Sequence, residues 1–194
     1  MENVIICIGR QYGSGGRYIG KLLAEELNIP CYDKELLYET SKESNINQNI
    51  VIENDERPNN FMYSLLAGSS SYGLPINQQV FLAQFDTIRK IANQGPCVIV
   101  GRCADYVLED LNNTVSIFIH APLENRIERA QQFYGLDEEK AKSQIKKIDK
   151  KRKDYYNFYT GKKWSDVNSY DLSISSKIGV EKVVEIIKNY VKVL

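Results

Sequence analysis

The sequence has no long apolar run, no surplus of charge of either sign, and little cysteine or histidine. No apolar stretch approaches the roughly 18 residues that a membrane-spanning helix needs, and the first residues show neither a charged leader nor a small-residue cleavage site. We therefore expect no membrane segment and no signal peptide. The 25 basic residues equal the 25 acidic ones, so the overall charge gives no reason to expect nucleic acid or a membrane as a partner.

The four cysteines are not spaced as metal ligands. Cys7 and Cys97 lie in apolar runs, where a reduced and buried thiol is the usual finding. Cys97 and Cys103 have no further ligand residues beside them, so we expect no cysteine metal site and a reducing, cytoplasmic setting. The single histidine, His120, follows an apolar run and is expected to have a structural role.

The most informative stretch that the chain does contain is VIICIGRQYGSGGRYIG, at residues 4–20. Its apolar run at 4–8 predicts a strand, the glycines that follow predict a tight loop, and 17–28 has the periodicity of an amphipathic helix. This order presents backbone N–H groups and a helix N-terminus to an anion, for which a nucleotide phosphate is the first candidate. The lysine of the usual G-x-x-x-x-G-K-[ST] motif is absent, so Arg17 or no residue takes its place.

Short apolar runs alternate with helical patterns along the rest of the chain. Strands are expected at 4–8, 31–32, 97–100, 115–119 and 170–175. Helices are expected at 17–28, from Asp33 as cap onward, at 76–94, from 102 to about 111, at 122–134, from Asp137 onward, and at 180–191. The stretch 45–60 shows no clear boundary, 68–79 is typical of a surface loop, and 155–166 is expected to be irregular. The alternation predicts one α/β domain with a parallel sheet of about five strands covered on both faces.

Charged residues follow several of the expected strands. In parallel sheets ligands bind beyond the carboxyl ends of the strands, so these residues are candidates for a site. They are Asp33 and Lys34, Arg102 and Asp105, Arg126 and Arg129, and the basic run 146–153 with Asp149 and Arg152. A phosphate loop together with several arginines suits phosphoryl transfer, which needs positioning and positive charge. Two other interpretations stay open: the two helical arginines as surface partners of neighbouring glutamates, and the basic run as a solvated face or a nucleic-acid patch.

Taken in order, these motifs resemble the cytidylate kinase-like group of P-loop nucleoside monophosphate kinases. The matching segments are GRQYGSGGRYIGKLLAEELNIPCYDKELL at 9–37, CVIVGRCADYVL at 97–108, VSIFIHAPLENRIERA at 115–130, IKKIDKKRKDYYNFYTGKKW at 145–164 and YDLSIS at 170–175. The resemblance implies a three-layer fold with a five-stranded parallel sheet. It also implies a core of 1–44, 76–125 and 168–194, an acceptor-side helical region at about 45–75, and a mobile lid at about 126–167.

The resemblance also implies roles for individual residues. ATP would be bound by Gly13, Ser14, Gly15, Gly16, Arg17 and Tyr18. The acceptor would be bound by Asp33, Lys34, Arg102, Asp105, Asp149 and Arg152. The catalytic arginines would be Arg17, Arg126, Arg129 and Arg152. Mg²⁺ would enter with ATP, with Ser14 as the nearest hydroxyl. In one gapless register Arg17 falls on the lysine of the motif, and in another Gly16 does.

The resemblance therefore predicts an ATP-dependent kinase for a nucleoside monophosphate, with CMP or dCMP first. Its partners would be ATP and the monophosphate, with neither nucleic acid nor membrane. Where true cytidylate kinases have an aspartate after the acceptor-binding arginine, this chain has Cys103, and the serine and arginine expected after Asp33 are replaced. The alternatives are a nucleotide sensor without catalysis, a kinase for another small acceptor, and a nucleic-acid-binding module.

Overall fold

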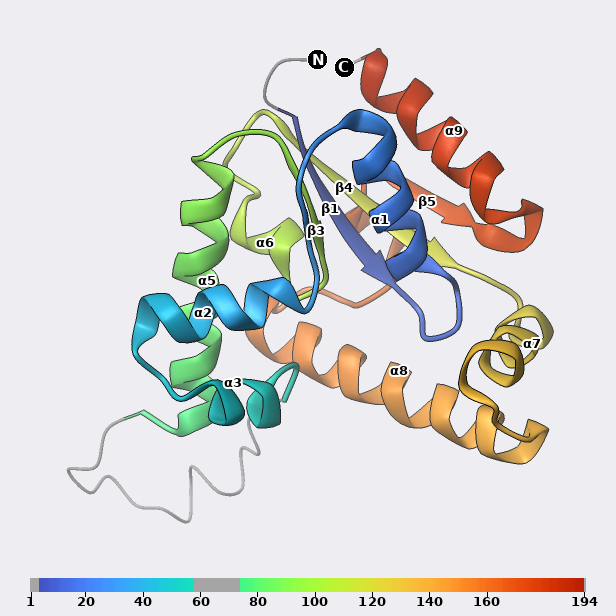
Figure 1. The fold of residues 1–194 in the computed structure, drawn as a ribbon, viewed down its shortest axis with the longest axis horizontal. Coiled ribbons are helices and arrows are strands. Elements are labelled where there is room, and N and C mark those ends of the chain that lie inside the picture. Colours follow the sequence, from blue (N-terminus) through green and yellow to red (C-terminus); the bar gives the residue numbers. More distant parts are fainter. Residues whose placement is uncertain (1–3, 58–73, 194) are drawn as a thin grey trace.

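The structure, a computed structural model, describes residues 4–57 and 74–193. Within them a five-stranded parallel sheet has the order β2-β3-β1-β4-β5 (Figure 1). The strands are β1 (Ile5–Arg10), β2 (Cys31–Tyr32), β3 (Cys97–Val100), β4 (Thr114–His120) and β5 (Leu172–Ser175). This confirms the predicted fold class. β1 continues beyond its expected end at residue 8, because Gly9 and Arg10 still pair with Phe118 and Ile119 of β4.

Helices cover both faces of the sheet. α1 (Gly16–Leu27) and α9 (Val180–Lys192) lie on one face, and α2 (Glu35–Ser44), α5 (Ile76–Ala92) and α6 (Ala104–Val107) on the other. α3 (Gln48–Asn54) packs on α2 and α5. α7 (Leu123–Tyr134) and α8 (Glu138–Thr160) follow β4, and α8 crosses the end of the sheet toward which β1 points (Figure 1). Two 3₁₀ turns, η1 (Val167–Ser169) and η2 (Ser176–Ile178), flank β5.

The core consists of two apolar layers separated by the sheet. Successive residues of a strand point to opposite faces. Accordingly, Ile6 and Ile8 of β1 pack with α1 and α9, whereas Ile5 and Cys7 pack with α2, α5 and α6. All four residues of β3 are buried, as expected for a central parallel strand. The sheet is therefore a rigid support for the loops at the carboxyl ends of its strands.

Several predicted boundaries were wrong, mostly where polar residues pack on other elements. Asp33 does not cap α2, because its carboxylate is paired with arginines instead; Lys34 is the cap residue. The helix after β3 is only four residues long. α8 continues through Thr160, since Tyr155 and Tyr156 are buried against α5 and α6 rather than lying in an irregular segment. Of the predicted loop at 68–79, residues 68–73 lie outside the described residues and 76–79 begin α5.

All four cysteines carry free thiols, and Cys7, Cys97 and Cys103 are buried. Burial raises the pKa of Cys97 to about 12, so its thiol is neutral at physiological pH. Among the described residues, no helix combines the length and the apolar character needed to cross a membrane.

Candidate functional site

The loop between β1 and α1 leads into the N-terminus of α1. Gly15 is the N-cap residue with φ +80°, and the neighbouring Ser14 hydroxyl accepts a hydrogen bond from the Gly16 amide at 3.3 Å. The first turn contains no acidic residue. The remaining first amides of a helix and its dipole favour an anion. The N-terminus of α1 thus has the features of a phosphate-binding end.

The glycine loop is in direct contact with α7. A Cβ atom on Gly13 would lie 2.7 Å from the carbonyl oxygen of Arg126, so the close approach of the two backbones requires glycine. Arg129 Nη1 donates to the carbonyl oxygens of Gly13 and Ser14 at 3.4 and 3.3 Å, and its Nη2 donates to the Ser176 carbonyl at 2.9 Å. Arg129 therefore ties the loop to η2, and it does not pair with a neighbouring glutamate on the surface of its own helix.

Arg126 joins the glycine loop to α8. Its Nη1 donates to the carbonyl of Tyr12 at 3.2 Å and contacts Asp149 Oδ2 at 2.5 Å, while the Tyr12 amide donates to Asp149 Oδ1 at 2.7 Å. The side chain of Arg126 is buried, and its Nε is one of two buried side-chain polar atoms in the described chain that have no hydrogen-bond partner. A buried donor without an acceptor is costly, which makes this atom a natural contact for a phosphate oxygen.

Arg10, the last residue of β1, occupies the space where a lysine would otherwise extend. A Cβ on Gly16 would lie 2.6 Å from the Cβ of Arg10, and a Cβ on Gly101 would lie 2.0 Å from Arg10 Nη1. Glycine is needed at both positions because this arginine passes between them. Burial and the neighbouring Arg152 lower the pKa of Arg10 to about 10, so it stays charged at neutral pH. If the alignment places Gly16 at the lysine of the motif, there is no room for a side chain at that position.

Arg17 points to the end of β2 rather than along the loop. Its Nε contacts Asp33 Oδ2 at 2.5 Å, and its side chain is 46% exposed. Arg102 contacts the other oxygen of Asp33 at 2.9 Å and binds Asp55 through Nε and Nη2 at 3.1 and 2.9 Å. Burial alone would raise the pKa of Asp33, but Arg102 and Arg10 outweigh it and hold that pKa below its usual value. Arg102 is thus bound by the side chains of both Asp33 and Asp55.

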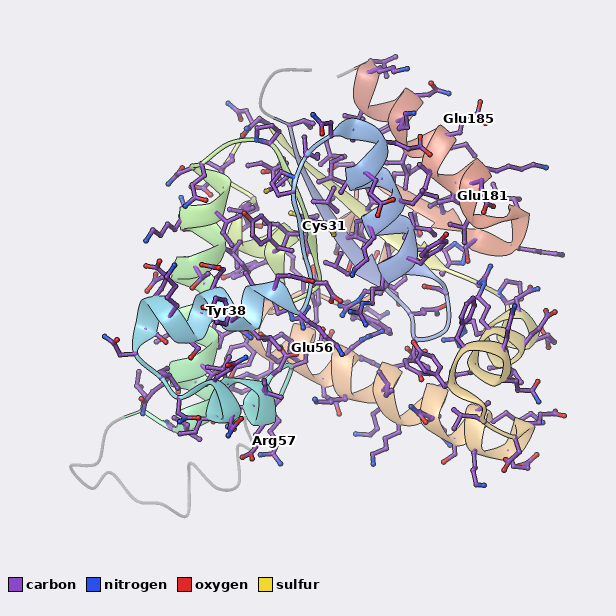
Figure 2. The ribbon with its side chains drawn as sticks, in the orientation of Figure 1. Cys31, Tyr38, Glu56, Arg57, Glu181 and Glu185 are labelled. Atoms are coloured by element: carbon purple, nitrogen blue, oxygen red, sulfur yellow. The ribbon has the colours of Figure 1, made fainter. Side chains whose placement is uncertain are left out.

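A second buried ion cluster centres on Glu56. Its Oε1 accepts from Arg10 Nη1 at 3.0 Å and its Oε2 from Arg152 Nε at 3.4 Å, while Arg152 Nη1 donates to the Arg10 carbonyl at 3.2 Å. Figure 2 shows Glu56 beside α8, with Arg57 farther out. Burial would raise the pKa of Glu56, yet Arg10 and Arg152 together hold it well below its usual range. The segment after α3 therefore links the core to α8.

Three predicted site residues are not brought into these clusters. Lys34 is exposed, and Tyr18 is 58% exposed. Asp105 accepts a hydrogen bond from the Tyr156 hydroxyl at 2.7 Å among aromatic rings, and burial raises its pKa. It does not replace the aspartate that the family places beside the acceptor-binding arginine; Asp33 and Asp55 are the acidic partners of Arg102.

The hydroxyl of Ser14, the predicted metal contact, is buried within the loop. It donates to the Gln11 carbonyl at 2.8 Å and accepts from the Gly16 amide at 3.3 Å. Across the described ranges 4–57 and 74–193, no group of three or more histidine, cysteine and acidic side chains could hold a metal ion.

Sequence reasoning missed Arg10, Asp55 and Glu56. Arg10 follows a glycine that seemed to end the first strand, and only its pairing with β4 extends that strand. Asp55 and Glu56 lie in the stretch without a clear boundary, and their partners are 46 to 96 residues away in sequence. The adjacent acidic pair was the available signal, but no local pattern points to distant arginines.

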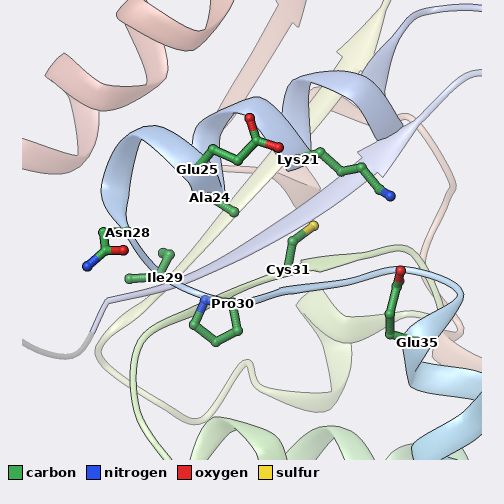
Figure 3. A pocket seen from close by; sticks show the side chains of 8 residues that line it. All are labelled: Lys21, Ala24, Glu25, Asn28, Ile29, Pro30, Cys31 and Glu35. Carbon is green, nitrogen blue, oxygen red and sulfur yellow. The ribbon is translucent and has the colours of Figure 1, made fainter.

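The hollow in Figure 3 lies apart from these clusters, between the end of α1 and β2. It has a volume of about 440 Å³ and is lined by Lys21, Ala24, Glu25, Asn28, Ile29, Pro30, Cys31 and Glu35. No residue of the glycine loop and no arginine lines it. Burial raises the pKa of the Cys31 thiol to about 11, so this sulfur is protonated at neutral pH. The hollow is therefore separate from the phosphate-binding end of α1.

Comparison with known proteins assigns the chain to a family. The sequence profile of the cytidylate kinase-like family matches residues 5–178. The chain belongs to the cytidylate kinase-like family. A search of curated proteins with this sequence finds no match.

Solved structures resemble this cytidylate kinase-like protein over almost its full length. An uncharacterized protein from Eubacterium ventriosum is 36% identical, with a TM-score of 0.76 over 97% of this chain and 98% of that one. The shikimate kinase of Bacteroides thetaiotaomicron is 14% identical, with a TM-score of 0.57 over 97% and 98% of the two chains. The APS kinase of Mycobacterium tuberculosis is 12% identical, with a TM-score of 0.52 over 98% of each. The last two show the fold alone; family and fold together support kinase-type phosphoryl transfer.

A methyl group at position 16 is expected to destabilise this protein. Gly16→Ala would place a Cβ 2.6 Å from the Cβ of Arg10 and 3.3 Å from that of Ile119. Both neighbours are near the backbone of central strands, so neither can move cheaply. We expect a loss of about 1–3 kcal/mol in the free energy of unfolding, measured by urea denaturation.

Arg17→Ala is the matched control, since it changes the next residue of the same helix turn at a partly exposed site and should cost less than about 1 kcal/mol. In an Arg10→Gly background, Gly16→Ala should cost at least about 0.5–1 kcal/mol less than in the wild type. An undiminished cost there would show that Arg10 is not the reason for glycine at position 16.

Proposed function

We propose that this protein transfers the γ-phosphoryl group of MgATP to a nucleoside monophosphate, with CMP or dCMP as the first candidates. One observation carries the proposal: three arginines of α7 and α8 donate hydrogen bonds to backbone carbonyls of residues 10–14. These arginines are Arg126, Arg129 and Arg152. They surround the loop with positive charge, which phosphoryl transfer requires.

The donor nucleotide would bind at the loop and the N-terminus of α1. Residues Gly13–Tyr18 would provide backbone N–H groups to its phosphates, as the family resemblance implies. The buried Nε of Arg126 has no partner within the described chain, so it offers a further donor for a phosphate oxygen. Mg²⁺ would arrive with ATP, and Ser14, whose hydroxyl bonds within the loop in this structure, is the nearest hydroxyl to it.

The acceptor would bind between the loop and the ends of β2 and β3. Arg102 and Arg152 lie on this side, and Asp33 fixes the orientation of Arg102. The acceptor's phosphate oxygen would attack the γ-phosphorus in line, and the arginines would stabilise the charge on the transferring group. A phosphate acceptor is already ionised, so the step needs no general base. The predicted lid at 126–167 would exclude water as a competing acceptor.

A small hydroxyl acceptor is the second candidate. Arg102 already donates three of its N–H groups to Asp33 and Asp55, so fewer donors remain for a second phosphate. An ionised carboxylate such as Asp33 can also accept a proton from a hydroxyl. A nucleotide sensor without catalysis would share the donor site but would not transfer phosphate.

A panel of acceptors tests these proposals. The purified protein is incubated with MgATP and each nucleoside monophosphate, sugar and polyol in turn, while ATP binding is measured by calorimetry. We expect ADP to form faster with CMP or dCMP than without an acceptor, by at least about tenfold. Transfer to a hydroxyl compound alone would support the second candidate, and ATP binding without any transfer would support the sensor. Absence of ATP binding would contradict all three.

A further inference from the structure

Two guanidinium groups from different elements bind the carboxylate of Glu56. Arg10 comes from β1 and Arg152 from α8. They bind separate oxygens of the carboxylate, at 3.0 and 3.4 Å. Burial would raise the pKa of Glu56, but Arg10 and Arg152 hold it below its usual range. One carboxylate thus occupies a strongly positive, buried position.

The backbone of Glu56 is held in an unfavourable conformation. Its φ angle is +50°, in the left-handed region that side chains other than glycine, asparagine and aspartate rarely adopt. The residue follows the end of α3 and belongs to no helix or strand. Conformations of this kind persist only where the surrounding structure imposes them, and they concentrate at binding sites and switches. Here the restraints are the two arginine contacts and the bond from Lys151 Nζ to the Asp55 carbonyl at 2.8 Å.

The arginines around Glu56 match the geometry with which proteins bind phosphate. Arginine donates from a planar fork to the oxygens of an oxyanion, so a phosphate can take the place of a carboxylate between two guanidinium groups. We propose that Arg10 and Arg152 form a phosphate-binding site that Glu56 occupies as an internal counter-ion, and that the phosphate group of a ligand replaces Glu56 there. Which ligand carries that phosphate rests on the proposed function; the site itself does not.

This arrangement has two consequences. The apparent affinity for phosphate is reduced by the fraction of molecules in which Glu56 fills the site, because only the vacated form can bind. Displacement of Glu56 also removes the contacts that hold residue 56 against the core and α8, since Arg10 and Arg152 then bind the ligand. Asp55 keeps its bonds to Arg102 and Gln84, so the backbone loosens beyond it. Ligand entry is thereby coupled to the junction between the acceptor-side region and the lid.

Removal of the Glu56 charge tests the proposal directly. We expect Glu56→Gln to bind inorganic phosphate at least about tenfold more tightly than the wild type, measured by calorimetry, because a neutral amide competes less well for the arginines. Glu53→Gln is the matched control, since this acid is exposed on the neighbouring helix α3 and should leave the affinity unchanged. Unchanged or weaker phosphate binding by Glu56→Gln would overturn the proposal.

Two further arms identify the source of the phosphate. If Glu56→Gln binds CMP but not ATP more tightly than the wild type, the site belongs to the acceptor. If it binds ATP but not CMP more tightly, the site belongs to the donor's terminal phosphate. These measurements need no turnover, so Glu56→Gln can gain affinity in a protein that fails the acceptor panel. That result would keep this site and reject the kinase proposal.

Hydrogen exchange of the wild-type protein provides a test that does not depend on the folding of the variant. On addition of saturating phosphate, the amides of residues 56–57 should exchange several-fold faster, while those of residues 13–18 should not become less protected. Increased protection of residues 56–57 would show that Glu56 stays in place when phosphate binds, and the displacement would then be wrong.

Discussion

Replacement of Arg102 by methionine is expected to lower the free energy of unfolding at pH 7 by about 3–5 kcal/mol. The guanidinium of Arg102 is almost fully buried and binds both Asp33 and Asp55. Methionine fills much of the same volume but leaves two carboxylates without their main partner. The cost therefore comes from uncompensated buried charge rather than from a cavity. Urea denaturation with an unchanged m-value would measure it.

Arg89→Met is the matched control for this prediction. Arg89 also binds an aspartate through two nitrogens, at 2.9 Å each, but both partners are exposed. Its loss should cost less than about 1 kcal/mol because solvent already screens the pair. Equal losses for the two variants would contradict the role of burial.

The pH dependence of the Arg102→Met deficit follows from Asp33. The pKa of Asp33 is lowered in the folded protein, so its pairing contributes stability above the unfolded pKa of about 4, and this contribution is lost as pH falls through the folded value. In Arg102→Met the Asp33 carboxylate is buried without its arginine partner, and its protonation removes the uncompensated charge. The difference between wild type and variant should therefore shrink below about pH 4. A deficit that stays the same when the pH falls below about 4 would point to packing instead.

The sequence predicts the sheet well because apolar runs and glycine breaks are local signals. The runs at 5–8, 97–100 and 115–119 all became central strands, each bounded by a turn or polar residue. Parallel order then placed their carboxyl ends on one side, where Arg102, Arg126 and Arg129 are indeed found. The fold class and the end of the sheet where the candidate site lies can thus be predicted from short stretches of sequence.

The partners of the arginines could not be predicted in the same way. Nothing in the sequence indicated that Asp149, a predicted acceptor-binding residue, would bind Arg126 and the Tyr12 amide. Glu56 and Arg10 meet across 46 residues, and their pairing depends on how α3 and β1 approach each other in space. Charge pairing between distant segments leaves no periodic trace in a sequence. In the register that places Gly16 at the position of the lysine, Arg10 occupies the space that a side chain there would need.

Arg126→Ala is expected to lower kcat by about a thousandfold while weakening ATP binding less than about tenfold. The prediction rests on the proposed function and on the position of Arg126 at the loop, where it contacts the Tyr12 carbonyl and keeps a buried Nε without a partner in the described chain. An interaction that strengthens as charge develops on the transferring group affects turnover more than ground-state binding. The measurement is kcat with the best acceptor of the panel, together with calorimetric titration of ATP.

A lid clamp without a catalytic role would give a different pattern. Arg126 also binds Asp149 of α8, so its loss could act only by loosening the contact between α8 and the loop. Asp149→Asn separates the two effects, because it weakens that contact but leaves the guanidinium in place. We expect Asp149→Asn to retain far more turnover than Arg126→Ala, and added guanidinium ion to restore part of the activity of Arg126→Ala alone. The exposed Lys146→Ala should behave as the wild type. Equal losses in the Arg126 and Asp149 variants without rescue would assign Arg126 to lid closure and remove it from the chemical step.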